Sequence, residues 1–222
     1  MKSTFYYSSH YLGVADSIKN YINSSPEFLS QQTVESPRAV GDALESLLAE
    51  KFDTFLGDWC AEYSSDFARR AMADLAFTDN EGFYTVVDVK THREDTKFNM
   101  PNLTSVERLA RFYESDSNIF CLILIRYIVQ GTKVTATEVA FTPIEFLSWE
   151  CLTVGALGWG QIQIANSNNI KIVDGYSRKK WMLELCDTLF EFYPKEIQKI
   201  QERVGRFEDV RAHWESREDV WC

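Results

Sequence analysis

The segment TVVDVK, at residues 85–90, constrains the fold of this chain more than any other stretch. Successive side chains of a β-strand point to opposite faces, so Val87 and Val89 lie on one face and Asp88 and Lys90 on the other. The valine face predicts burial in a core. The polar face brings an acid and a base together at the end of a buried strand, as either an ion pair or part of a reactive site.

The pattern of the whole chain predicts an α/β protein with a mixed central β-sheet flanked by helices. Its 222 residues, 45% of them apolar, are enough for one domain with a sizeable core. We expect a single domain over residues 1–222 that ends in long C-terminal helices. The pattern predicts helices at 9–23, 38–57, 104–115, 143–151, 177–193 and beyond Pro194, and strands at 72–78, 83–90, 118–130, 133–142 and 158–166.

The acidic balance of the chain bears on its partners. The formal net charge is −10, whereas binding to phosphates normally needs a basic surface. An acidic protein can still carry a basic cleft, and a site that gathers metal ions needs carboxylates. The charge therefore argues against non-specific binding of nucleic acid without excluding a DNA-binding site.

Neither a targeting segment nor a membrane span is expected. The longest apolar run, residues 119–129, contains Arg126 and is much shorter than the roughly 18–20 residues that a membrane-spanning helix needs. The five cysteines are scattered and show neither zinc-ligand nor redox spacing. A reducing, cytoplasmic location fits this pattern.

A second carboxylate is expected beside Asp88. The sequence DNEG predicts a hairpin turn between two strands, and Asp74 and Asp88 are about equally far from the turn centre near residue 81. Asp74, Asp88 and Lys90 then converge, and Glu45 on helix 38–57 supplies a further carboxylate from behind. Asp79 and Glu81 are either turn residues or rivals of Asp74 for the first acidic position.

Two carboxylates with a backbone carbonyl and waters form an all-oxygen site suited to Mg²⁺. A lysine beside such an ion can orient an attacking water and stabilise the charge that grows on a phosphorus atom. These are the parts that phosphodiester hydrolysis needs. The alternative interpretation is a structural ion network in a non-catalytic α/β module.

Several stretches together resemble one branch of the PD-(D/E)-x-K nucleases, the type II restriction endonucleases of the HincII kind, related to the EcoRV group. The first acidic motif lacks its proline and reads MADLAF, and the second reads VVDVK. The stretches that carry the resemblance are ADLAFTDNEGFYTVVDVKT (73–91), PNLTSVERLA (101–110), GWGQIQIAN (158–166), GYSRKKW (175–181) and, more weakly, GDALESLLAEKF (41–52).

The resemblance implies a Mg²⁺-dependent homodimer that cuts both strands of double-stranded DNA at a short palindromic site, leaving blunt ends. Asp74 and Asp88 would be the metal ligands and Lys90 the catalytic lysine. A side chain in the loop after the catalytic lysine, here Asn99 or Met100, would insert between stacked bases. A repair or junction nuclease on the same core is the nearest alternative activity.

Two groups of residues are candidates for DNA contact. One follows the strand at 158–166 and combines short polar side chains that can read base edges with cations suited to phosphates, namely Asn166, Ser167, Asn168, Asn169, Lys171, Arg178, Lys179 and Lys180. The polar part of this group is also typical of a turn. The other lies at the site itself and comprises Lys90, His92, Arg93 and Lys97. A palindromic target requires two-fold symmetry, which the terminal helices or the first helix would provide.

Overall fold

The computed structural model describes residues 2–25, 27–64, 73–96, 101–166 and 169–219. Its contacts group the chain into two compact units, Met1–Arg178 and Lys179–Cys222, and each is described by itself. The first unit contains both β-sheets. The second consists almost entirely of one helix.

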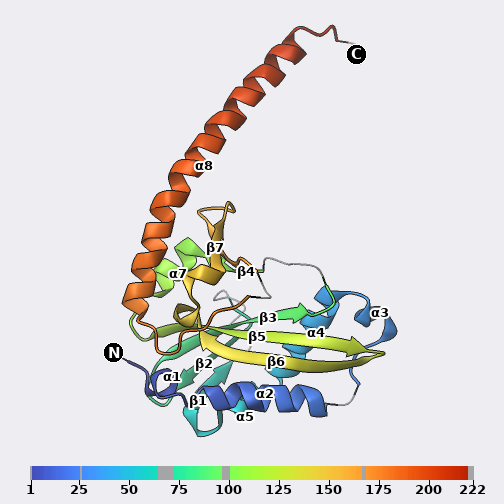
Figure 1. Cartoon of the computed structure of the whole chain (residues 1–222), viewed down its shortest axis with the longest axis vertical. Helices are drawn as coiled ribbons and strands as arrows, with labels where there is room; N and C mark the ends of the chain where they lie inside the picture. Colours follow the sequence, from blue (N-terminus) through green and yellow to red (C-terminus); the bar gives the residue numbers. More distant parts are fainter. Residues whose placement is uncertain (1, 26, 65–72, 97–100, 167–168, 220–222) are drawn as a thin grey trace. The chain divides into compact units, whose positions relative to one another are not determined.

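The first unit is built around a five-stranded sheet with the order β1-β2-β3-β5-β6. β3 and β5 run parallel, and the other neighbouring pairs are antiparallel. The predicted mixed sheet flanked by helices is therefore confirmed (Figure 1). Its strands are β1 Cys60–Ser64, β2 Leu75–Asp79, β3 Tyr84–Arg93, β5 Asn118–Gln130 and β6 Lys133–Pro143.

Helices cover one face of this sheet and bury the main core. α2 packs against β6, and α4 packs against β3. The apolar face of α4, with Val40, Leu44 and Leu48, is fully buried in the core together with Val87 of β3. Among its described residues, the helices that lie wholly within the first unit are α1 Thr4–Tyr7, α2 Leu12–Ser24, α3 Gln31–Val34, α4 Pro37–Ala49, α5 Phe52–Leu56 and α7 Val106–Phe112.

A second, three-stranded antiparallel sheet with the order β4-β8-β7 was not expected from the sequence. It lies with α7 on the side of the large sheet away from α2 and α4 (Figure 1). Its strands are β4 Asn102–Ser105, β7 Leu152–Gly155 and β8 Gln161–Ile164, and three 3₁₀ turns complete the unit at Gly57–Trp59, Ile144–Phe146 and Trp149–Cys151. The helix predicted at 143–151 is thus a pair of 3₁₀ turns.

α4 begins where the sequence predicts a start. The side chain of Ser36 accepts a hydrogen bond from the backbone N–H of Ala39, and Pro37 occupies the first turn, where a missing N–H costs nothing. The predicted helix 38–57 is interrupted after Ala49 and resumes as α5. Phe52 and Leu56 of α5 still enter the same core, so the predicted apolar face is retained.

α8, Arg178–Glu215, is one continuous helix of 38 residues that contains Pro194. Figure 1 shows it as a single long helix in orange and red. No helix in the described part of the chain has the combined length and apolar character required to cross a membrane.

Candidate functional site

The β2–β3 hairpin brings Asp74 close to Asp88. The antiparallel register of the two strands ends at Leu75 and Val87. Just before it, the backbone N–H of Asp74 donates to the carbonyl of Val87 at 3.0 Å, one residue out of that register. Asp74 is near enough to Asp88 for its negative charge to raise the pKa of Asp88. The hairpin spacing in the sequence thus predicted the register of β2 and β3 and the proximity of the two carboxylates.

Asp79 and Glu81, the two other candidates for the first acidic position, lie in the turn of this hairpin. Asp79 Oδ1 accepts hydrogen bonds from the backbone N–H groups of Glu81 and Phe83, both at 2.9 Å. Gly82 follows with φ +82°, a left-handed conformation that glycine adopts without strain. Asp79 and Glu81 are therefore turn residues, at the opposite end of β2 from Asp74.

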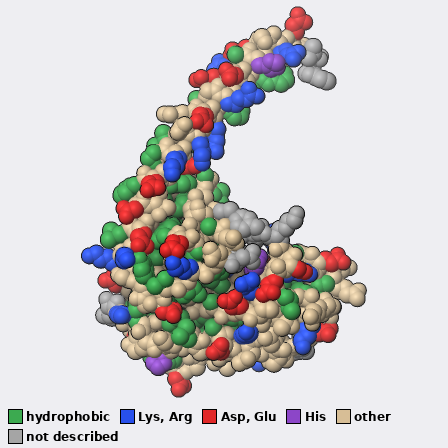
Figure 2. Space-filling view, in the orientation of Figure 1, with side chains coloured by type: hydrophobic (Ala, Val, Ile, Leu, Met, Phe, Trp, Pro, Cys, Tyr) green, Lys and Arg blue, Asp and Glu red, His purple; other side chains and the backbone are tan. Residues whose placement is uncertain are grey.

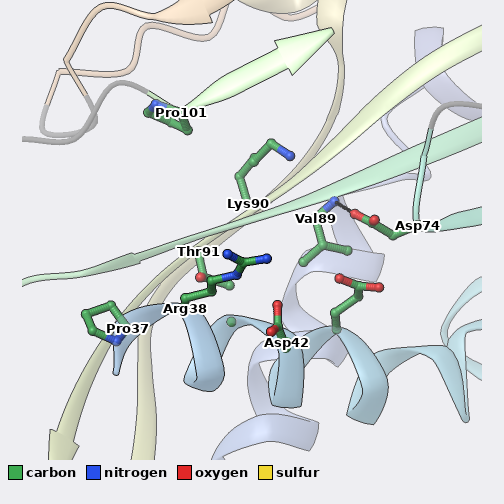
Figure 3. A pocket seen from close by; sticks show the side chains of 10 residues that line it. Pro37, Arg38, Asp42, Asp74, Val89, Lys90, Thr91 and Pro101 are labelled. Carbon is green, nitrogen blue, oxygen red and sulfur yellow. Dashed lines mark hydrogen bonds between the residues drawn. The ribbon is translucent and has the colours of Figure 1, made fainter. Parts of the chain in front are cut away.

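Lys90 and Asp74 are each hydrogen-bonded to the segment Asp88–Val89 of β3. Lys90 Nζ donates to Asp88 Oδ1 at 2.8 Å. Asp74 Oδ2 accepts the backbone N–H of Val89 at 2.7 Å, as the dashed line in Figure 3 marks. The three charged groups predicted to converge are thus connected through consecutive residues of one strand.

Asp88 carries the most perturbed carboxyl group of the site. Only 5% of the residue is exposed, and burial raises its pKa to about 7. The cation of Lys90 opposes this rise, whereas the negative charges of Asp74 and Glu45 add to it. Within the described part of the chain, Asp88 Oδ2 is buried and has no hydrogen-bond partner. A strongly shifted carboxyl with an unsatisfied oxygen is typical of a functional site.

Asp74 and Lys90 open onto a pocket of about 520 Å³ between α4 and β3. Figure 3 shows Thr91 on the side of β3 that faces Arg38 and Asp42 of α4, while the side chain of Lys90 points to the other side of the strand. The lining residues are Pro37, Arg38, Gly41, Asp42, Glu45, Asp74, Val89, Lys90, Thr91 and Pro101. Glu45, predicted to support the site from behind, therefore belongs to its wall.

Arg38 and Asp42 were missed by the sequence interpretation. The sequence nevertheless contains a signal for these two residues. Arg38, Asp42 and Glu45 are spaced so that they share one face of a helix, next to the buried face that carries Val40 and Leu44. A polar row next to a core stripe marks the rim of a buried helix face. Without the position of β3, that row is indistinguishable from a solvated surface.

The donor set of the site fits Mg²⁺. No three His, Cys, Asp or Glu side chains among the described residues are arranged to hold a metal ion together. Mg²⁺, however, usually binds through only one or two carboxylates and completes its shell with waters and substrate phosphates. Asp74 and Asp88, with the unsatisfied oxygen on Asp88, supply that pair.

The residues predicted to contact DNA are placed very differently. Asn99, Met100, Ser167 and Asn168 lie outside the described residues, as does Lys97. Asn166 and Asn169 are exposed, and the backbone N–H of Asn169 donates to the carbonyl of Asn166 at 2.9 Å, as in a turn. Lys179 and Lys180 belong to the second unit.

Two of the predicted phosphate contacts have protein partners instead. Lys171 Nζ pairs with Glu150 at 2.6 Å on the surface. Arg178 Nε donates to the buried carboxylate of Glu145 at 2.9 Å, and the guanidinium lies 4.3 Å from the ring centroid of Tyr113. Tyr113 donates its hydroxyl to the same carboxylate at 2.7 Å. This arrangement gives Arg178 a structural role that the basic run at 178–180 did not reveal.

Of the basic residues near Lys90, Arg93 is engaged with its own neighbourhood. Its guanidinium donates to the carbonyl of Val34 and pairs with Asp95, both at 2.7 Å. His92 is nearly buried on β3.

Comparison with models of known protein families gives no match, and neither does comparison with curated protein sequences. The assignment of function therefore depends on the geometry and on the motifs of the sequence.

Proposed function

We propose that this protein is a Mg²⁺-dependent endonuclease of the type II restriction class, which cuts double-stranded DNA at a short palindromic site. One observation carries the proposal. The β2–β3 hairpin brings Asp74 close to Asp88, and Lys90, two residues after Asp88 on the same strand, is bonded to Asp88. This is the arrangement that the resemblance to PD-(D/E)-x-K nucleases implies, and it lies beside a pocket.

Each residue has a distinct part in the proposed reaction. Asp74 and Asp88 would hold Mg²⁺, which when bound would polarise the scissile phosphate and favour the ionised form of the attacking water. Lys90 orients that water and stabilises the extra negative charge on the phosphate in the transition state. Glu45 lies on the wall of the pocket, where its charge favours retention of a cation.

The raised pKa of Asp88 supports a catalytic rather than a purely structural role. A carboxylate that existed to pair with Lys90 would be expected to have a lowered pKa, because an opposite charge nearby favours the ionised form. The pKa of Asp88 is instead raised to about 7, chiefly by burial. The group is therefore poorly stabilised as an anion until a further cation joins it.

The Asp88–Lys90 ion pair, at 2.8 Å, is also the one observation that favours the alternative of a structural ion network. The two proposals predict opposite behaviour for Asp88→Asn. A structural pair loses stability when one partner is removed, since the other charge is left without compensation. A metal site keeps its fold or becomes more stable, and loses cleavage.

A palindromic target cut on both strands requires two copies of the site related by a two-fold axis. The proposed active form is accordingly a homodimer. The negative net charge of the chain is compatible with this activity, because two cations, Arg38 and Lys90, line the pocket. A bound Mg²⁺ would add further positive charge for a phosphate.

The proposal is tested by incubating plasmid and phage DNA with the protein and Mg²⁺. Discrete fragments are expected from the wild type, and sequencing their ends gives the site, its symmetry and the cut position. Lys90→Ala should leave the DNA intact, while Lys133→Ala, an exposed lysine at the β5–β6 turn, should cut normally. Intact DNA with folded wild-type protein, in Mg²⁺ and in Mn²⁺, would overturn the proposal. A smear of fragments or nicked circles would instead indicate a repair or junction nuclease.

A further inference from the structure

The second unit carries a regular apolar stripe that its own fold leaves exposed. The side chains of the stripe lie on one helix, α8, and are between 36% and 74% exposed, whereas Trp181 and Leu185 of the same helix are buried. Figure 2 shows hydrophobic side chains along this helix among charged ones. The stripe comprises Leu183, Phe190, Tyr193, Ile197, Ile200, Val204, Phe207 and Trp214.

The spacing of the stripe is that of a coiled coil. One series, from Leu183 through Phe190 and Ile197 to Val204, repeats every seven residues, and so does a second from Tyr193 to Trp214. The second series lies three residues after the first, so the two correspond to the a and d positions of a heptad. Cys186 and Arg211 occupy the remaining positions of the stripe. A strict seven-residue repeat keeps the stripe facing a partner helix, whereas a helix on a globular core follows a period of 3.6.

A lone helix with this pattern has little to stabilise it. Among the described residues of the second unit, α8 is the only helix or strand, and most helical stability in proteins comes from packing of an apolar face. A shallow hollow of about 420 Å³ runs along the stripe from Ile200 to Arg211. Knobs of a facing helix would fill such a hollow in knobs-into-holes packing.

We propose that α8 pairs with α8 of a second copy of this chain as an antiparallel two-stranded coiled coil. In an antiparallel pair, each a position lies opposite a d position of the second helix. In one register, every residue of the stripe faces another residue of the stripe on the second copy. Ile197 then meets Ile200 of the second copy at the two-fold axis, and Phe190 meets Phe207. The outer layers match equally well, since Val204 faces Tyr193 and Leu183 faces Trp214.

The flanking positions favour this register. Glu196 and Arg203 are at equivalent g positions, and the antiparallel register brings each beside the other residue of the second copy, twice per dimer. The apolar g residues Leu189 and Val210 match each other in the same register. Glu208 meets Asp187, a like-charge pair at the exposed edge, where screening keeps the cost small.

Arg211 distinguishes the two orientations. In a parallel pair Arg211 would lie against Arg211 of the second copy, so that two like charges would share one layer of the core. In the antiparallel register it lies opposite Cys186 and one position from Asp187 of the second copy. Arg211 pairs with Glu215 of its own helix at 2.8 Å in either orientation. The two orientations therefore differ in the Arg211–Arg211 contact, which the antiparallel arrangement avoids.

The stripe is large enough for a stable dimer. Half of its eight members are aromatic, and an aromatic side chain buries about 150–250 Å² when fully covered. Covering the exposed parts of all eight yields an area that approaches the roughly 800 Å² per partner of an ordinary specific interface. The inference names an interface for the homodimer of the proposed function, but it is argued from α8 alone and does not depend on nuclease activity.

Sedimentation equilibrium of the full chain tests the pairing. The wild type should be a dimer in the micromolar range, and Ile200→Lys should raise the dimer dissociation constant by about 100-fold or more, because a charge replaces a buried apolar side chain in both copies. Ala212→Lys adds the same charge on the exposed outer face and should leave the constant unchanged. A monomeric wild type, or an Ile200→Lys variant that dimerises as tightly as the wild type, would overturn the proposal.

Cross-linking tests the orientation. Arg211→Cys should be joined to Cys186 of the second copy by a short bismaleimide, and the added Cys186→Ser change should abolish that link. Glu196→Arg should weaken the dimer by placing two cations beside each other, and Glu196→Arg with Arg203→Glu should restore it. Efficient linking of Cys186 to Cys186 in the wild type would show a parallel pair and overturn the antiparallel register. All these readouts are independent of DNA cleavage, so an inactive protein that still dimerises leaves this inference intact.

Discussion

Asp74 accepts the backbone N–H of Val89 at 2.7 Å, and this bond ties the first carboxylate of the site to the strand that carries the second. The bond lies between Asp88 and Lys90 in the sequence, so the position of Asp74 is coupled to the positions of both. A carboxylate held by a backbone N–H keeps its place when a ligand arrives or leaves. This bond fixes the position of Asp74 without help from the proposed Mg²⁺.

Asp74→Asn should preserve the fold and strongly reduce the rate of cleavage. The amide oxygen of asparagine can still accept the N–H of Val89, whereas the loss of a negative charge weakens the hold on Mg²⁺. Loss of one such charged group commonly lowers the rate by about 10²–10³. Single-turnover cleavage of plasmid DNA measures the rate, and thermal unfolding measures the fold. A rate within a few-fold of the wild type would remove Asp74 from the proposed metal site.

Lys90→Ala should be inactive and should also raise the pKa of Asp88 further. The cation of Lys90 is the main influence that lowers this pKa, so its removal leaves the buried carboxyl more easily protonated. The pKa can be followed by NMR of the Asp88 side-chain carboxyl carbon. A pKa that falls in the variant would contradict the ion pair at 2.8 Å.

Asp88→Asn should change the pH dependence of stability in a defined direction. The pKa of Asp88 is raised to about 7 in the folded state, so between about pH 4 and pH 7 the unfolded chain releases a proton that the native protein retains. The contribution of Asp88 to the free energy of unfolding therefore becomes less favourable as the pH rises through this window. As the pH rises from about 4 to about 8, the free energy of unfolding of Asp88→Asn should therefore increase relative to that of the wild type, by on the order of a few kcal/mol in total.

Urea unfolding at several pH values measures this gain. A second readout is Mg²⁺, which should raise the melting temperature of the wild type near pH 8, because a ligand that binds only the native state stabilises it. The same addition should leave Asp88→Asn unchanged. A variant that is less stable than the wild type by the same amount at every pH above about 5 would favour a structural ion pair.

The sequence allowed prediction of those parts of the site that follow from strand periodicity and hairpin symmetry. The register of β2 and β3, which brings Asp74 near Asp88, the shared face of Asp88 and Lys90, and the mixed sheet all arise from local rules. The small sheet could not be predicted in the same way. β4 has four residues beside the start of α7, and its register is set by β8, nearly sixty residues later.

The role of Arg178 could not be predicted for a related reason. In the sequence it begins a run of three cations, which favours phosphate binding. Its partner Glu145 follows a proline in a 3₁₀ turn and is buried, a placement that depends on the packing of distant elements. Local charge patterns identify where cations are concentrated, but not which of them are already paired.

Arg178→Ala should therefore destabilise the protein strongly. Removing the guanidinium leaves Glu145 buried with only Tyr113 as a hydrogen-bond donor among the contacts described above, and breaking such a buried pair costs about 3–5 kcal/mol. Lys179→Ala, at the neighbouring exposed position, should change the free energy of unfolding by less than about 0.5 kcal/mol. Urea unfolding of both variants measures the difference, and equal small effects would show that the Glu145 pair contributes little.

Gly41 fixes how closely α4 approaches the strand that carries Lys90. A Cβ atom added at Gly41 would lie 2.9 Å from Thr91 Oγ1, closer than ordinary van der Waals contact. Gly41→Ala should thus push α4, with Arg38 and Glu45, away from β3 and lower the cleavage rate. Its effect on stability should be small or unfavourable, although alanine normally favours a helix over glycine by about 1 kcal/mol.

Thr91→Ala removes the hydroxyl that a Cβ at Gly41 would meet. Testing Gly41→Ala in the Thr91→Ala variant separates the effect of this contact from the effect of alanine on helix stability. In that background Gly41→Ala should gain up to about 1 kcal/mol of stability and have a smaller effect on cleavage, because the helix no longer has to move. A double-mutant cycle on the free energy of unfolding and on the cleavage rate measures the coupling. Additive effects of the two changes would mean that α4 and β3 do not meet at this point, and the pocket wall would have to be formed differently.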